Sequence, residues 1–116
     1  MQRVVRISTL PENALQASAD FYRSHLAMVI DSLAGNATSL AVVFPPASYA
    51  HRGWRRAAIA NLAREFAPAR INGIAGSEGE ALEAALAWLD RSPGVTGQLL
   101  GLCGQFEECE AYLPDE

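Results

Sequence analysis

Short apolar segments alternate along the chain with longer segments whose apolar residues recur at helical spacing. Some segments alternate apolar and polar side chains and others form continuous apolar runs, and both patterns are typical of strands. The strand-like segments are residues 3–8, 39–44, 70–75 and 97–102. The helix-like segments are residues 11–34, about 50 or 53 to 67, and 80–89. Strict alternation of strand and helix predicts an α/β fold with four parallel strands, right-handed crossovers and helices on both faces of the sheet.

The starts of the first and third helices carry sequence signals. Pro11 and Glu12 suit a first helical turn, because proline fits that turn and a carboxylate stabilises its positive end. Ser77 and Glu80 have the spacing of a capping box before the third helix. The apolar stripe of the first helix consists of Leu15, Ala19, Tyr22, Leu26, Val29, Ile30 and Leu33.

Composition favours one domain with an acidic end. The 116 residues are 50% hydrophobic and 19% charged, which is enough apolar material for a packed core. Five of the thirteen acidic residues lie in residues 107–116, so the remaining eight acids and nine arginines give the body a formal charge of about +1. We therefore expect a domain over residues 1–106 and an acidic tail over residues 107–116, either a solvated end or a docking segment for a basic partner.

Several function classes are disfavoured by what the chain contains. No apolar run approaches the roughly 18 residues of a membrane helix, and the start has no secretory pattern. Cys103 and Cys109 cannot build a disulfide framework. They are six positions apart and the two histidines lie elsewhere, so the chain lacks the defined ligand spacing of a zinc site. All nine basic residues are arginine and alanine is abundant, which is typical of a GC-rich bacterial genome. We expect a cytoplasmic bacterial protein with no metal and no membrane contact.

Five segments resemble the short-chain dehydrogenase/reductase family, in the order in which that family carries them. Residues 62–68 (LAREFAP) and 71–76 (INGIAG) are similar to the end of a family helix and to the strand after it. The later segments are residues 80–89, residues 95–100 with a Thr-Gly-Gln sequence, and residues 103–105 (CGQ) where the family often has Asp-Gly-Gly. The resemblance covers residues 39–105 and implies the C-terminal half of the family's domain. We therefore expect a truncated Rossmann-like three-layer sandwich.

The turn after the first strand does not suit the family's nicotinamide cofactor. Dinucleotide binding needs a glycine-rich turn there, so that the backbone can approach the pyrophosphate. Residues 8–13 contain no glycine, and the first glycine of the chain is Gly35. Glu12 would also repel a phosphate. We expect no bound cofactor.

The family's catalytic Tyr-x-x-x-Lys pair is also missing, because the chain has no lysine. A gapless match back from residues 67–68 places Ser48 in the tyrosine slot and Arg52 in the lysine slot. A match on residues 57–59 instead places Arg52 and Arg56 in these slots. Arginine keeps a positive charge but cannot supply the phenol that acts as acid or base. The resemblance therefore implies a degenerate catalytic site and favours a protein that is not an enzyme.

The most unusual segment is basic and lies near the start of the second helix. It contains His51, Arg52, Trp54, Arg55 and Arg56. These residues are candidates for binding an anion or a protein partner, because arginine and tryptophan are frequent in both kinds of site. A solvated helix start is the alternative. Nucleic acid is not expected as a partner, because the body has no broad basic surface.

These observations predict an oligomerising or accessory subunit with dehydrogenase-like architecture and no catalysis of its own. The family resemblance implies a homodimer through the helices at about 11–34 and 53–67, since the corresponding family helices form the main dimer contact. A heteromer with a full-length reductase is equally open. Two further hypotheses are an anion- or small-ligand-binding module that uses Arg52–Arg56, and a reductase completed in trans by a partner that supplies the NAD(P) half.

Overall fold

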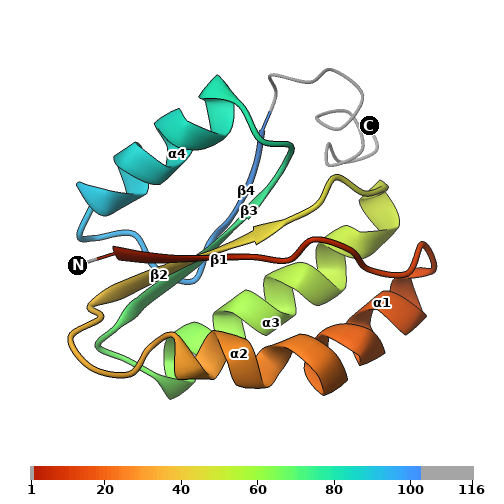
Figure 1. Ribbon diagram of the computed structural model, residues 1–116, viewed down its shortest axis with the longest axis horizontal. Coiled ribbons are helices and arrows are strands. Elements are labelled where there is room, and N and C mark those ends of the chain that lie inside the picture. Colours follow the sequence, from red (N-terminus) through yellow and green to blue (C-terminus); the bar gives the residue numbers. More distant parts are fainter. Residues whose placement is uncertain (1, 103–116) are drawn as a thin grey trace.

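Four parallel strands form the middle layer of a three-layer sandwich (Figure 1). In the computed structural model, which describes residues 2–102, the strands lie in the order β1-β2-β3-β4. The strands are β1 (Gln2–Arg6), β2 (Ser39–Phe44), β3 (Arg70–Ala75) and β4 (Leu99–Gly101). The helices are α1 (Ala14–Asp20), α2 (Leu26–Asp31), α3 (Arg52–Glu65) and α4 (Glu80–Asp90). All neighbouring strands pair in parallel, which confirms the expected Rossmann-like α/β fold class.

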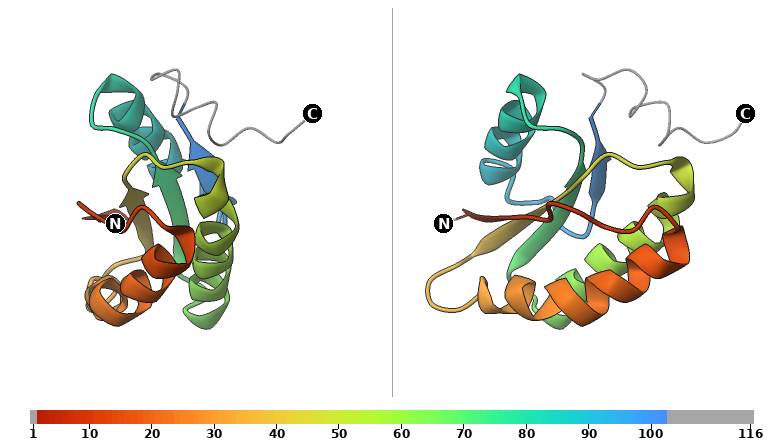
Figure 2. Two further views of the ribbon diagram at one scale, coloured as in Figure 1. Left: turned by 90° about the vertical axis from the view of Figure 1, so that its right-hand side faces the viewer. Right: turned by 45° about the vertical axis from the view of Figure 1, so that its right-hand side comes forward.

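The central strand β2 supplies both faces of the sheet with core residues. Leu40, Val42 and Phe44 are buried on the face covered by α1, α2 and α3. Ala41 and Val43 are buried on the opposite face, which α4 covers (Figure 2). Successive side chains of a strand point to opposite faces, so a continuous apolar run is what a strand covered on both sides requires.

The crossover through α4 differs in hand from the other two. The segments α1–α2 and α3 lie on one face and α4 lies on the other, although the strand order advances in one direction throughout (Figure 1). Right-handed crossovers that advance in one direction place all their helices on the same face. The expectation of uniformly right-handed crossovers is therefore wrong for α4. Its buried Leu82, Leu86 and Leu89 cover an apolar face that the other described helices leave bare.

The asparagine of the INGIAG segment joins β3 to the turn that precedes β4. The buried Asn72 side chain donates from Nδ2 to the Val95 carbonyl at 3.0 Å, and its Oδ1 accepts from the Gln98 amide at 3.0 Å. A Cβ at the neighbouring Gly73 would lie 2.9 Å from Cγ1 of Ile59, so glycine there allows α3 to pack closely on β3. The INGIAG segment thus positions α3 through Gly73 and the turn before β4 through Asn72.

Replacing Asn72 with alanine is expected to lower the free energy of unfolding by about 2 kcal/mol, because two partly buried backbone groups lose their partners. Chemical denaturation monitored by circular dichroism measures this change. The control is Gln98→Ala, because the Gln98 side chain makes only an exposed bond to Thr96 and its backbone amide remains. That control is expected to change stability by less than about 0.5 kcal/mol. Equal losses in both variants would contradict the role of Asn72.

The first helical segment, residues 14–31, comprises α1, a π-helical turn and α2, and it starts later than the sequence indicates. It begins at Ala14, where the Oδ1 atom of Asn13 accepts a hydrogen bond from the Gln16 amide at 3.0 Å. Pro11 and Glu12 instead belong to the loop that follows β1. An asparagine N-cap satisfies one of the free amides at a helix start, so Asn13 and not the proline fixes the boundary.

The apolar stripe expected on this segment faces the sheet only in part, through Val29 and the partly buried Leu26 and Leu33. The fully buried residues of the segment are Ala17, Phe21 and Val29. Leu15 is 80% exposed, and Tyr22 and Ile30 are also exposed. A π-helical turn (Phe21–His25) separates α1 from α2. Its i→i+5 bonding inserts one extra residue, which shifts the phase of the side chains that follow it.

The capping box expected at Ser77 and Glu80 is not formed. The N-cap residue of α4 is Gly79, with φ 148° and no side-chain cap hydrogen bond. Glu78, which lies between Ser77 and Gly79, accepts a hydrogen bond from Nε of Arg6 on β1 at 2.7 Å. Only glycine readily adopts this backbone conformation, so the turn at Gly79 sets the helix start.

The proposed boundary at residue 106 and the acidic tail over residues 107–116 lie outside the described residues, as do Cys103 and Cys109. Within residues 2–102, every helix is too short or too polar to cross a membrane.

Candidate functional site

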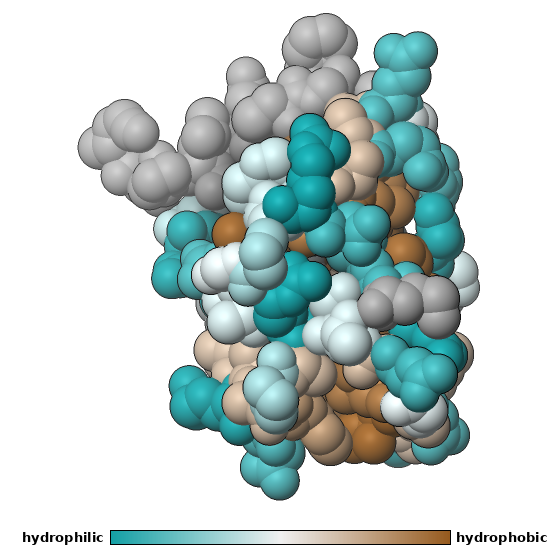
Figure 3. Space-filling model, turned by 90° about the vertical axis from the view of Figure 1, so that its left-hand side faces the viewer, coloured by the Kyte–Doolittle hydropathy of each residue, from teal (hydrophilic) through white to brown (hydrophobic). Residues whose placement is uncertain are grey.

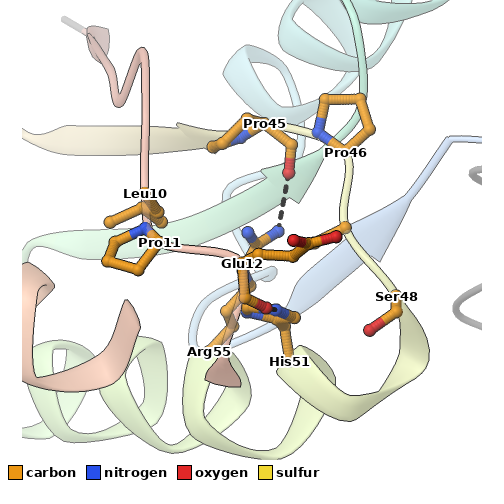
Figure 4. A pocket seen from close by; sticks show the side chains of 9 residues that line it. Leu10, Pro11, Glu12, Pro45, Pro46, Ser48, His51 and Arg55 are labelled. Atoms are coloured by element: carbon orange, nitrogen blue, oxygen red, sulfur yellow. Dashed lines mark hydrogen bonds between the residues drawn. The ribbon is translucent and has the colours of Figure 1, made fainter. Parts of the chain in front are cut away.

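The loops that follow β1 and β2 border a pocket at the carboxyl edge of the sheet (Figure 4). The pocket has a volume of about 320 Å³ and is lined by residues 10–12, residues 45–48, His51 and Arg55. Parallel α/β sheets bind ligands at this edge, because the loops there are held in place by the strands. The pocket is therefore the candidate site for ligand binding or catalysis.

His51 joins the two loops and has both ring nitrogens engaged. It lies in a short 3-10 turn (Tyr49–His51) before α3 and is 3% exposed. Trp54 donates from Nε1 to Nδ1 of His51 at 3.2 Å, and Nε2 of His51 lies 2.8 Å from the Glu12 carbonyl. Because an indole can only donate, Nδ1 is the acceptor and the ring proton is on Nε2, bound to Glu12. His51 holds the loop after β1 against α3 and keeps no ring nitrogen for a ligand.

Arg55 is the most unexpected residue of the pocket, because it is 1% exposed. Its Nη1 atom donates to the Pro45 carbonyl at 2.9 Å (Figure 4). The guanidinium lies 4.8 Å from the ring centre of Phe44 and 5.6 Å from that of Trp54. These contacts tie α3 to the loop after β2 and place a positive charge in the pocket wall.

The other two arginines of the segment lie outside the pocket lining. Arg52 is half-buried, with its guanidinium 5.9 Å from the ring centre of Tyr49. Arg56 is exposed. Within residues 2–102, no carboxylate lies within the 4.0 Å of an ion pair from either guanidinium. The helical period has therefore divided the basic segment, with His51 and Arg55 turned inward and Arg52 and Arg56 turned outward.

A second hollow, the apolar groove, lies between the first helical segment and α3. The groove has a volume of about 320 Å³. It is lined by Tyr22, Leu26, Ile30, Ala58, Asn61, Leu62, Glu65 and Phe66. Figure 3 shows apolar side chains exposed at the lower end of the molecule, where α2 and the end of α3 lie in Figure 1. Of the exposed members of the stripe, Tyr22 and Ile30 border this groove.

A family model described as short chain dehydrogenase-like protein matches residues 5–102. This chain belongs to the short chain dehydrogenase-like family. The match confirms the resemblance carried by the segments between residues 62 and 100 and extends it to β1 and the first helical segment. No curated protein and no solved structure matches the chain at a significant level.

The two sequence matches assign the family's tyrosine and lysine slots to residues that do not all line the pocket. Ser48 is exposed and lines the pocket, whereas Arg52 and Arg56 do not line it. The pair that lines the pocket at a spacing of four residues is His51 and Arg55. Sequence matching did not pair these two residues, although the spacing of four in His51-x-x-x-Arg55 is visible in the sequence.

The loop after β1 in this short chain dehydrogenase-like chain is held in place by the side chain of His51. The Glu12 carbonyl accepts from His51, and Glu12 also lines the pocket. Sequence reasoning considered Glu12 only as a helix start and an obstacle to phosphate. Between residues 2 and 102, no cluster of three histidine, cysteine or carboxylate side chains could hold a metal ion.

Proposed function

We propose that this chain is a non-catalytic short chain dehydrogenase-like subunit that assembles through the apolar groove. The observation that carries the proposal is the outward stripe of the first helical segment. Leu15, Tyr22 and Ile30 are exposed although they lie at helical spacing on one segment. Clustered exposed apolar side chains beside a groove favour a protein interface, because they gain stability only when another surface covers them.

The kind of occupant follows from the family. The family resemblance implies that the two helices bordering the groove form the main dimer contact. A second copy of the chain, or a full-length reductase with the same helices, fits this surface. A dimer of such subunits, or a mixed complex in the cytoplasm, is the assembly that we propose.

The chemistry of the pocket supports the non-catalytic part of the proposal. Reduction of a carbonyl needs a group that delivers a proton to the oxygen. The single ring proton of His51 is bound to the Glu12 carbonyl, and Arg55 keeps its proton in any protein environment. The chain has no lysine, and Tyr49 does not line the pocket. Ketone reduction by the purified chain with a nicotinamide cofactor would contradict this part.

Replacing Ile30 with glutamate is expected to weaken assembly by at least about 100-fold, because a carboxylate buried in an apolar contact costs several kcal/mol. Sedimentation velocity over a range of protein concentrations measures the dissociation constant. Ile30 lines the groove and is partly exposed, so the isolated fold tolerates the change.

The matched control is Met28→Glu. Met28 is on the same helix and is 46% exposed, but it does not line the groove. We expect it to leave the dissociation constant within about threefold of that of the unchanged chain. A chain that stays monomeric alone, and copurifies from its own cells with no second protein in native mass spectrometry, would refute assembly as the function.

A further inference from the structure

Arg52 and Arg56 occupy the flank of α3 that faces β4. Residues four and seven positions apart on a helix share one side, so Arg52, Arg56 and Ala63 lie on one flank. A Cβ at Gly97, just before β4, would lie 3.6 Å from Cβ of Ala63. The opposite flank, with Asn61 and Glu65, borders the apolar groove. The arginine pair is therefore on the β4 side of the helix, away from the proposed assembly surface.

The end of β4 is level with these arginines. α3 is a crossover helix and runs antiparallel to the strands. Residue numbers therefore decrease along α3 in the direction in which they increase along β4. The five residues from Gly97 to Leu102 span about 16 Å in extended form. The eleven residues from Ala63 back to Arg52 span about 16 Å of helix. Leu102 therefore leaves the sheet close to the first turns of α3.

The arginine pair of α3 and the sequence of residues 107–116 carry opposite charges. Neither Arg52 nor Arg56 has a carboxylate at ion-pair distance within residues 2–102. The acids of the C-terminal segment are Glu107, Glu108, Glu110, Asp115 and Glu116. Five extended residues after Leu102 reach about 16 Å, which brings Glu107 within range of either arginine.

We propose that the acidic segment of residues 107–116 docks on Arg52 and Arg56 of the same chain. The short tether gives the acids a local concentration in the millimolar range, so weak exposed ion pairs suffice for binding. The contact covers the start of α3 and occupies the arginines that an external anion would otherwise use. Salt weakens it, because these charges face solvent.

A spin label on Cys109 tests the proposal in the full-length chain with Cys103→Ser. At low salt, the label is expected to broaden the amide resonances of residues 52–56 at least threefold more than those of Arg23 and Arg64. Arg52→Gln with Arg56→Gln is expected to remove this difference, and so is 0.5 M sodium chloride. Inorganic phosphate at tens of millimolar is expected to reduce it, with sodium chloride at equal ionic strength as the reference.

The matched control is Arg23→Gln with Arg64→Gln, which removes the same charge from other exposed positions. The control is expected to leave the broadening at residues 52–56 unchanged. Equal loss in both double variants would refute the site, because only the total charge would then matter. Broadening that disappears on dilution or on mixing with unlabelled chain would refute docking within one chain and assign the contact to a second copy. Each outcome is independent of Ile30→Glu, so this test and the test of assembly fail separately.

Discussion

Replacing Arg55 with alanine is expected to lower the free energy of unfolding by about 3 kcal/mol. The change leaves the Pro45 carbonyl without its donor, removes the guanidinium from the rings of Phe44 and Trp54, and opens a cavity beside the pocket. Removing a buried charge offsets part of this loss, which keeps the expected value below the sum of the separate effects. Urea denaturation followed by tryptophan fluorescence measures the change.

The neighbouring Arg56 is the control for this experiment. Arg56 is exposed on the same helix, so Arg56→Ala is expected to change stability by less than about 0.5 kcal/mol. Arg55→Met separates the two roles of the buried side chain, because methionine keeps most of the packing without the charge. A methionine variant as stable as the unchanged chain would show that packing alone accounts for Arg55. Equal stability of the Arg55 and Arg56 alanine variants would contradict the buried position.

Replacing Phe21 with alanine is expected to lower the free energy of unfolding by about 4 kcal/mol, the largest effect that we predict. Phe21 is fully buried, with its ring centre 5.7 Å from that of Phe44 and 5.6 Å from that of Trp54. The three rings connect the first helical segment, β2 and α3. The loss therefore combines a large cavity with two aromatic contacts. Calorimetry is expected to show a melting temperature lower by more than about 10 °C.

Met28→Ala is the comparison for Phe21→Ala, because Met28 lies on the following helix and is exposed. It is expected to cost less than about 0.5 kcal/mol. The near-ultraviolet circular dichroism of Trp54 is expected to change in the Phe21 variant alone. A loss below about 1.5 kcal/mol for Phe21→Ala would mean that the first helical segment contributes little to the core.

The strands and their pairing could be predicted from the sequence, because a short apolar run such as residues 39–44 is typical of a strand buried on both faces. The facing of the first half of the first helical segment could not be predicted, although Leu26, Val29 and Leu33 of the expected stripe do face the core. It has two apolar sides, one with Ala17 and Phe21 and one with Leu15 and Tyr22, and helical spacing alone does not rank them. The π-helical turn then changes the phase at Phe21, and no residue type marks such a turn.

The basic segment shows a similar limit. Charged residues are rarely fully buried, so the sequence favoured five exposed or interfacial residues at the start of α3. The structure instead divides them, because Arg55 shares a helix face with Ala58, Ile59 and Leu62. Burial of Arg55 depends on the Pro45 carbonyl and the Phe44 ring, which a loop brings to it from another element. The roles of Arg52, Trp54 and Arg56 in binding a partner stay predictions.

The placement of α4 has a consequence for how the chain is made. Although α4 follows β3, it lies over the beginning of the sheet, where the Gln2 side chain donates to the Leu86 carbonyl and Arg6 pairs with Glu78. These contacts join residues more than 70 positions apart. A nascent chain on the ribosome therefore keeps one apolar face of β1 and β2 uncovered until residues 80–90 have emerged. Such a face invites aggregation during synthesis, so we expect early release of the chain before α4 to yield insoluble fragments.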